Sequence, residues 1–483
     1  MPLAGASMLV VLAVTLLATG LPSWVALIGV AMLYAAGGLI AGAFPASLLA
    51  AMPGRVLGLM ESDILQALPL YVLMGALLVR MPLAATVYRA LASLLARTGA
   101  GPPLAGLTLA ALLSPMNGSV AATALMLGRT VAPRLAASGA LPERATALTC
   151  AASTLGVVIP PSLVLILLGD AMMRAHTEAL NATRAAVRIV NTQDVFTGAL
   201  LPAAILFALM AGVAWLRSRE TQWRVEHASF RDLTVAAGTI AFIVALLAGV
   251  TAGILFAVEA AAAGAVALLA LGAMSGGLTR ASMAEVLRDA LAISGALFSL
   301  LVAATIFTLV LRAFGTDRWL ADLLSSLPGG APVVLVTVLA VVGACALVLD
   351  AFEMIFVVIP IAMPPLLAVI PDAAWVSVVV LLVLAATFAT PPMGYAVLLA
   401  RQAQAERVTL ARLLRELAPF LAVQWVVLAL VLAVPQLVWH RVPMELPAAA
   451  GEDAGRDALI EQLQREEEAQ EPATQAPVPP ARP

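Results

Sequence analysis

Apolar runs long enough to cross a bilayer recur along the whole chain, and they constrain its fold more than any other feature. A helical run of about 18 residues or more covers roughly 30 Å of hydrocarbon. Only 11% of the residues are charged and 62% are hydrophobic, whereas an ordinary soluble domain has about 25% charged residues. So few charges exclude a soluble enzyme, a nucleic-acid-binding protein and a disordered scaffold. The sequence therefore predicts an all-α polytopic protein of the lipid bilayer.

The breaks between apolar runs predict ten crossings. They lie near 3–20, 24–43, 63–80, 145–168, 198–216, 232–250, 252–274, 290–311, 373–399 and 417–440. Two further segments, 103–136 and 331–370, are too long for one crossing and are interrupted by SPMNGS and around Asp350, respectively. Non-helical backbone at membrane depth needs polar partners from the protein or a water-filled cavity. We therefore expect two re-entrant helical hairpins with tips buried against neighbouring helices.

Matched interruptions at one spacing indicate an internal repeat. The proline pair Pro160-Pro161 is followed 231 residues later by Pro391-Pro392, and the same offset relates Ser119 to Asp350. The repeat predicts two homologous halves, residues 1–216 and 232–440, each with five crossings and one hairpin. Because five is odd, the second half enters the membrane from the opposite side, which makes the repeat inverted.

The arginines predict the orientation of this topology. With the N-terminus outside, 16 of the 22 arginines before residue 441 fall in cytoplasmic loops, including the Arg-rich linker 217–231. The polar insertion at 170–196 then faces the periplasm, either as a partner contact or as a solvated connecting helix. The acidic, Pro-rich tail at 441–483 is predicted to be disordered. With ten spans it lies outside, and one additional span would place it in the cytoplasm.

The broken helices and the hairpin tips supply the candidate binding residues. A proline pair inside a helix leaves backbone carbonyls unpaired, and broken helices of inverted-repeat transporters direct such carbonyls at coupling ions and half-helix N-termini at substrate anions. Small and hydroxyl-bearing residues nearby suit sodium, although proline kinks and small-residue packing also occur in helices that bind nothing. The sodium or substrate candidates are Ser114, Asn117, Gly118, Ser119 and Thr123 at the first tip, Asp350 and Glu353 at the second, Thr154, Gly156, Pro160 and Pro161 at the first break, and Thr387, Thr390, Pro391, Pro392 and Gly394 at the second.

Signatures of enzymes are missing from the sequence. It contains no HExxH, GxSxG or GxxxxGK[ST] motif, and its three histidines are scattered. A membrane-embedded hydrolase that uses Asp350 and Asp170 remains an alternative without a motif. We expect a protein that is not an enzyme, has no cofactor and binds no metal except sodium, so that an ion gradient or a partner protein drives any transport.

Five segments together resemble the large membrane subunit of tripartite ATP-independent periplasmic (TRAP) transporters. They are SPMNGSVAATALMLGRTVAP, GVVIPPSLVLILLGD, GILFAVEAAAAGAVALL, LDAFEMIFVVIPIAMPPLL and FATPPMGYAVL, and the similarity covers most of residues 1–440. This chain has FAVEAA at 256–261 where the family often has TPTEAA, so the hydroxyl and proline chemistry there is absent.

The resemblance implies a bacterial inner-membrane permease that imports a small organic acid with sodium. It also implies an elevator, in which both hairpins and both broken helices move against a scaffold, and two partners: a small four-helix membrane subunit and a periplasmic binding protein that delivers the substrate. The alternative is a stand-alone homodimeric sodium/dicarboxylate symporter of the divalent-anion type. Such symporters usually have Ser-Asn-Thr at their hairpin tips, whereas this tip reads Asn117-Gly118-Ser119.

Overall fold

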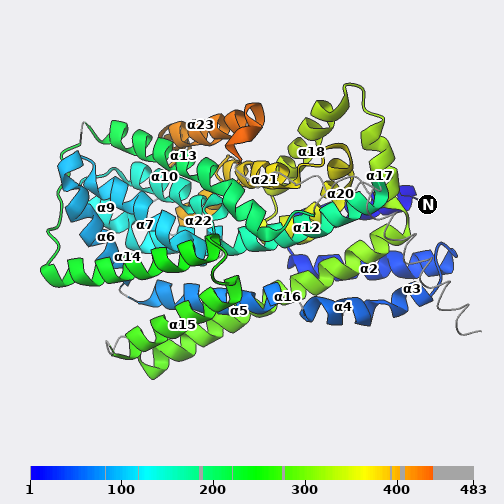
Figure 1. The fold of residues 1–483 in the computed structure, drawn as a ribbon, viewed down its shortest axis with the longest axis horizontal. Helices are drawn as coiled ribbons and strands as arrows, with labels where there is room; N and C mark the ends of the chain where they lie inside the picture. The colour runs from blue at the N-terminus through cyan, green and yellow to red at the C-terminus, as the bar shows by residue number, and fades with distance from the viewer. Residues whose placement is uncertain are drawn as a thin grey trace, which may run out of the picture.

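The fold is described by a computed structural model for residues 2–438, except 62, 82, 118, 184–188, 220, 275–277, 392–393 and 403–407. In these residues, helices are joined by short connections and no strand occurs, so the predicted all-α class is confirmed. The helices pack into an elongated bundle (Figure 1). The predicted disordered tail at 441–483 lies outside the described residues.

The first half of the chain ends in one long helix after a hairpin and a broken helix. Its elements are α1 (Pro2–Thr19), α2 (Ser23–Ile40), α3 (Ser47–Ala50), α4 (Met52–Met60), α5 (Asp63–Arg80), α6 (Leu83–Leu94), η1 (Leu95–Thr98), α7 (Gly101–Asn117), α8 (Val120–Thr130), α9 (Ala132–Ala137), α10 (Pro142–Ser153), α11 (Leu155–Val158), α12 (Leu163–Thr183) and α13 (Thr192–Ser218).

The second half follows the same order with fewer breaks. Its elements are α14 (Phe230–Thr251), α15 (Ala257–Met274), α16 (Arg280–Ala313), α17 (Thr316–Ser325), α18 (Gly330–Ala346), α19 (Ala351–Glu353), η2 (Met354–Val358), α20 (Ile359–Val369), α21 (Ala373–Phe388), α22 (Tyr395–Gln402), α23 (Leu410–Ala433) and η3 (Pro435–Leu437). The segment η2 is one π-helical turn inside the second hairpin.

Helix starts recur at the spacing of the sequence repeat. Helix α8 begins at Val120 and α19 at Ala351, and α10 begins at Pro142 and α21 at Ala373, each pair 231 residues apart. The continuous α16, 34 residues long, stands where the first half has α4 and α5, which bend by 53°. At 1.5 Å per residue, α16 extends about 50 Å, so it must tilt or project beyond roughly 30 Å of hydrocarbon.

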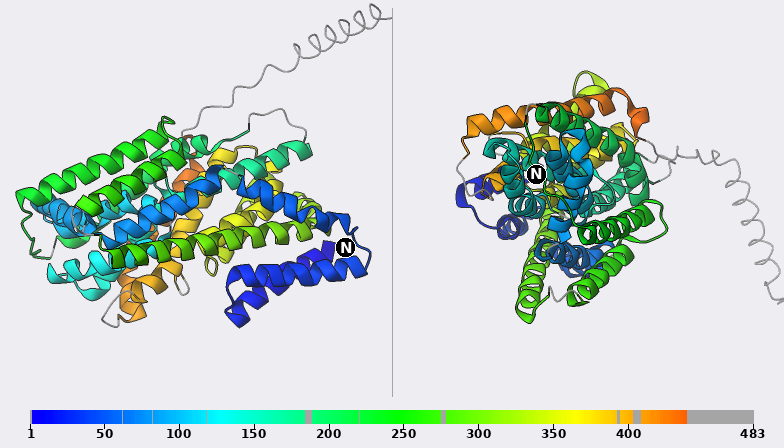
Figure 2. Two further views of the ribbon diagram at one scale, coloured as in Figure 1. Left: turned by 90° about the horizontal axis from the view of Figure 1, so that it is seen from below. Right: turned by 90° about the vertical axis from the view of Figure 1, so that its left-hand side faces the viewer.

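The two halves interlock through equivalent helices. Helix α2 packs along α16 of the second half, and α15 packs along α5 of the first half. Helices α5 and α16 also pack on each other. One cavity touches the end of α5 and the first half of α16, and another touches the start of α5 and the second half of α16. Helices α5 and α16 therefore run antiparallel, as an inverted repeat requires. Figure 2 shows α16 running along much of the length of the bundle.

The count of candidate spans differs from the ten predicted. Among the described residues, seven helices are long and apolar enough to cross a bilayer, or nine if each of two bent pairs counts as one span. Two apolar stretches predicted as spans fall below that length: Leu3–Thr19 within α1, and α21, whose helix stops before Pro391. One of the seven is 351–369, predicted as a hairpin arm, because this arm has 19 residues.

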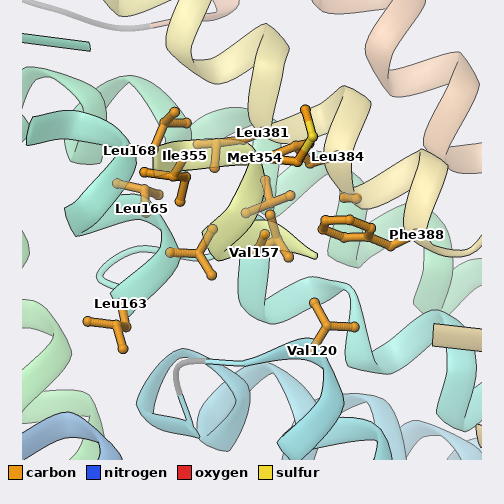
Figure 3. Close-up of a cluster of buried hydrophobic side chains, with 14 of the residues drawn as sticks. Val120, Val157, Leu163, Leu165, Leu168, Met354, Ile355, Leu381, Leu384 and Phe388 are labelled. Atoms are coloured by element: carbon orange, nitrogen blue, oxygen red, sulfur yellow. The ribbon is translucent and has the colours of Figure 1, made fainter. Parts of the chain in front are cut away.

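The centre of the bundle is the broken-helix region. Every residue of α21 is buried, which identifies it as an interior helix, and Trp375 donates a hydrogen bond from Nε1 to the Val431 carbonyl at 3.0 Å. Side chains of α11, α12, η2 and α21 meet in one apolar cluster, with Val157, Leu165, Ile355 and Leu384 pointing toward one another (Figure 3). This cluster joins the second hairpin to both broken helices.

Candidate functional site

Each hairpin tip is the start of a helix. Ser119 has extended backbone, and its Oγ accepts a hydrogen bond from the Ala121 N–H at 3.2 Å, which caps α8. Asp350 occupies the equivalent position before α19, where its Oδ1 accepts from the Glu353 N–H at 2.9 Å. Both interruptions that the sequence repeat paired are therefore N-caps.

Asp350 and Glu353 form a reciprocal capping box. The Asp350 N–H donates to Glu353 Oε2 at 3.1 Å, and Ser23 Oγ donates to Glu353 Oε1. Glu353 thus fastens the second hairpin to α2. The sequence singled out both acids as ion or substrate candidates, and the structure gives each a local role in starting α19 as well.

The first break is closely packed against the first hairpin. Gly156 lies so near α7 that an added Cβ would be 2.5 Å from Ser114 Cβ and 2.9 Å from its backbone carbon. Ser114 is buried, and its Oγ has no partner among the described atoms. Thr154 Oγ1 accepts a hydrogen bond from Gln424 Nε2 at 2.7 Å and donates to the Ala151 carbonyl. The candidates Ser114, Gly156 and Thr154 therefore make contacts between helices.

Pro160 and Pro161 lie between α11 and α12, where the helix axis turns by 41°. Because neither proline has an N–H, the helix is interrupted there and α12 begins after Ser162. The Ser162 Oγ accepts from the Leu165 N–H at 3.1 Å and so begins the new helix. The break predicted at this proline pair is present.

The second break brings carbonyl oxygens together. An added Cβ on Gly394 would be 2.5 Å from the Thr390 carbonyl oxygen and 2.8 Å from that of Phe388. The Gly394 carbonyl accepts the Val397 N–H at 2.9 Å. Thr390 donates its hydroxyl to the Ala386 carbonyl at 2.7 Å, and Pro391 lies in the turn. Clustered carbonyls of this kind are the ligands that a sodium ion prefers.

Several candidates contribute less to this picture. Thr123 and Thr387 are buried on α8 and α21. Gly118 and Pro392 lie outside the described residues, and the side chain of Asn117 is not described.

Both hairpin tips open onto one cavity of about 490 Å³, which we name the tip cavity. Ser119, Asp350 and Leu163, the first residue of α12, line it from one side. Helices α5 and α16 line the other side with small residues at helical spacing, which leave the space unfilled. These are Gly75 and Ala76 on α5 and Ala292 and Ala296 on α16.

Two arginines that the sequence analysis did not single out also line the tip cavity. Arg80, at the end of α5, is paired with Glu285 and with Asp289 at 2.8 Å, both on α16. Arg129, at the end of α8, is exposed and has no ion-pair partner among the described residues. The sequence held one usable signal for Arg129, which lies ten residues after Ser119 on the same hairpin arm. Helical spacing puts positions 122, 125 and 129 on one face of α8, and that face lines the cavity.

The charges in the tip cavity balance. Among its described lining residues, Arg80 and Arg129 carry positive charge, and Asp289 and Asp350 carry negative charge. Within the described residues, no group of three or more His, Cys, Asp or Glu side chains could hold a metal ion. The described lining therefore offers two guanidinium groups, two carboxylates and the N-terminus of α8, and the guanidinium groups and the helix N-terminus suit a small anion.

Known transporters resemble this chain over most of its length. It is 24% identical over 264 residues to the C4-dicarboxylate TRAP transporter large permease protein DctM of Rhodobacter capsulatus, a match that spans 53% of this chain and 60% of that protein. It is 23% identical over 388 residues to the sialic acid TRAP transporter large permease protein SiaM of Vibrio cholerae, covering 79% of this chain and 87% of that protein.

A solved structure shares the fold. The crystal structure of the Alcanivorax borkumensis YdaH transporter superimposes with a TM-score of 0.55 at 16% identity, covering 80% of this chain and 88% of that one.

The family profile for the tripartite ATP-independent periplasmic transporter, DctM component, matches residues 9–437. That range contains both hairpins, both breaks and the tip cavity, and it confirms the resemblance seen in the five sequence segments. The chain is thus a multi-pass transporter component rather than an enzyme, and it belongs to the DctM family of tripartite ATP-independent periplasmic transporters.

Proposed function

We propose that this chain is an inner-membrane permease subunit that imports a small carboxylate together with sodium, after a periplasmic binding protein delivers the substrate. The observation that carries the proposal is the tip cavity, which is lined by two helix N-termini and by the guanidinium of Arg129, which has no ion-pair partner among the described residues. Positive helix ends and a guanidinium favour a carboxylate. The relatives named for C4-dicarboxylate and sialic acid transport agree with that class of substrate.

The charge balance of the tip cavity gives a physical reason for coupling to sodium. With two arginines and two acids ionised, the lining is neutral. A sodium ion bound among the carbonyls of the second break or at the tips adds one positive charge, and a carboxylate then restores neutrality. Each ion thereby reduces the cost of bringing the other out of water, which is a reciprocal coupling of two binding events.

An elevator fits the position of the tip cavity. The cavity lies between the hairpins and α12 on one side and the interlocked helices α5 and α16 on the other. Movement of the first group along the second would carry a bound carboxylate across the membrane without dismantling the contacts at the tips. A small membrane subunit would extend the surface of the stationary group.

Uptake into proteoliposomes tests this function. The full chain with its small membrane subunit is reconstituted, and accumulation of labelled succinate and sialic acid is measured with and without the binding protein and an inward sodium gradient. We expect accumulation only when both the binding protein and the gradient are present. Arg129→Gln should reduce it at least tenfold, while the control Arg134→Gln, which does not line the cavity, should transport normally. Uptake by this chain alone would contradict the proposal and favour the stand-alone symporter.

A further inference from the structure

A second cavity lies along the same pair of helices as the tip cavity. It has a volume of about 590 Å³ and is bounded by α4, α12, α16 and the second hairpin. The tip cavity contacts α5 at 72–80 and α16 at 289–297, whereas the second cavity contacts α5 at Leu65 and α16 at 301–312. The two cavities therefore lie toward opposite ends of the α5–α16 pair. We name the second one the insertion cavity, because the start of the polar insertion forms one of its walls.

The insertion cavity is the repeat equivalent of the tip cavity. Adding 231 to the α5 positions 72–80 gives 303–311 on α16, and adding it to the α8 positions 119–129 gives 350–360 on the second hairpin. Both resulting ranges contribute residues to the insertion cavity. An inverted repeat thus produces one cavity toward each side of the membrane, and the arginine distribution places the insertion cavity on the periplasmic side.

The polar insertion supplies charged side chains to this cavity. Helix α12 continues to Thr183, well past the predicted end of the span at 168, and Asp170, Arg174 and Glu178 follow one another at intervals of four residues. That interval puts all three on the face that lines the cavity. The insertion folds back through buried His176, whose Nδ1 accepts the Val190 N–H at 3.1 Å. The insertion therefore begins as part of a cavity wall, in addition to connecting two spans.

The charges of the insertion cavity do not balance. Arg174 pairs with Asp170 at 3.0 Å, and Arg312 of α16 pairs with Glu178 at 2.7 Å. Arg55 of α4 also lines the cavity, is exposed and has no ion-pair partner among the described residues. Three arginines against two acids leave one net positive charge in the lining.

Arg312 adds hydrogen-bonding capacity toward an anion. Its bonds to Glu178 and to the Pro360 carbonyl both use Nη2. The Nε–H and Nη1–H groups of the same guanidinium are outside these bonds, and each can donate one charge-assisted hydrogen bond to an anion. The hydroxyls of Thr305 and Thr308 donate to carbonyls of their own helix. The arginines are therefore the groups that determine the charge of the ligand this cavity favours.

We propose that the insertion cavity is a periplasmic binding site for a small carboxylate, held by Arg55 and Arg312, which receives the substrate before it reaches the hairpin tips. The inference rests on the proposed function for the identity of its ligand. It differs from the tip cavity in one chemical respect: its lining is already positive, so it attracts an anion without sodium. Substrate capture and sodium coupling are then separate events at separate places.

Reaction rates of an engineered thiol measure the sign of charge in this cavity. Thr308→Cys is placed in a Cys345→Ala background, because Cys150 is buried and Cys345 is the more accessible native thiol. The purified full chain is treated with an anionic methanethiosulfonate (ethylsulfonate) or a cationic one (ethyltrimethylammonium). We expect the anionic reagent to react faster. Arg55→Gln should lower the anionic-to-cationic rate ratio about fivefold, as for loss of one charge roughly a nanometre away in a partly aqueous site.

The control is Arg318→Gln, which removes an exposed arginine next to the same end of α16 without lining the cavity. It should leave the rate ratio unchanged. Succinate or sialic acid at millimolar concentration should slow the anionic reagent more than chloride does at equal ionic strength, in the absence of sodium.

Each outcome decides between the site and its absence. Equal rates for both reagents, an equal effect of Arg55→Gln and Arg318→Gln, or protection by neither carboxylate would overturn the insertion-cavity site. These rates require no transport, so they separate the two proposals. If the thiol labels as predicted but sodium-driven uptake is absent, only the permease function is rejected. If uptake is normal but the labelling pattern is absent, only the periplasmic site is rejected.

Discussion

Gly156→Ala tests the contact that holds the first break against the first hairpin. The new methyl carbon would lie 2.5 Å from Ser114 Cβ, 2.9 Å from its backbone carbon and 3.0 Å from its carbonyl oxygen. Carbon atoms in contact prefer about 3.5–4.0 Å, so α7 and α11 must separate by about 1 Å. Because two of the three neighbours are backbone atoms, no side-chain rotation relieves the overlap. We expect a loss of about 1–3 kcal/mol, as for other overpacked cores.

The assay is thermal unfolding of the purified chain in detergent, with Gly29→Ala as the matched control. Gly29 is also helical, and nothing lies within 4 Å of its added Cβ. Alanine there should be neutral or should raise the midpoint temperature, since it favours the helix by up to about 1 kcal/mol. Adding Ser114→Gly to Gly156→Ala removes the nearest atom and should restore part of the lost stability. If Gly156→Ala unfolds at the same temperature as Gly29→Ala, the close packing described here is wrong.

Two further variants separate structural from functional roles. Gln424→Leu removes the buried donor to Thr154 and should lower the free energy of unfolding by about 1–3 kcal/mol. In a double-mutant cycle with Thr154→Val, the double variant should lose less stability than the two single variants together. Strict additivity of the two losses would show that the hydrogen bond contributes nothing. Asp350→Asn keeps an N-cap acceptor for α19 but removes a charge from the tip cavity, so the unfolding temperature should stay near wild type while the sodium dependence of uptake weakens. Asp350→Ala should lower the unfolding temperature and also weaken the sodium dependence. An unchanged sodium response in both variants would exclude this acid from coupling.

The sequence predicted the breaks and hairpins well because their signals are local. Proline pairs interrupt a helix whatever surrounds them, and Ser119 and Asp350 are residues that start helices. The offset of 231 residues then related the two halves without any tertiary information. The exact number of spans was harder to predict from the sequence, because the end of a helix such as α21 depends on tertiary packing as well as on Pro391.

The grouping of site residues could not be read from the sequence. Ser114 and Gly156 had the small size of ion-site residues, yet they mark a contact between α7 and α11. Arg80 and Arg129 looked like ordinary positive-inside residues, yet they line the tip cavity. These assignments depend on which helix faces cross in space, and one sequence carries that information only through weak patterns of small residues.

The most direct test is a ligand-bound structure of the full chain with the proposed small subunit, determined once with sodium and once with choline in its place. The account predicts density for the transported carboxylate in the tip cavity, within hydrogen-bonding distance of Arg129 and beside both hairpin tips, only when sodium is present. Carboxylate density in the tip cavity at equal occupancy in choline, or no carboxylate density in the tip cavity with sodium, would contradict it.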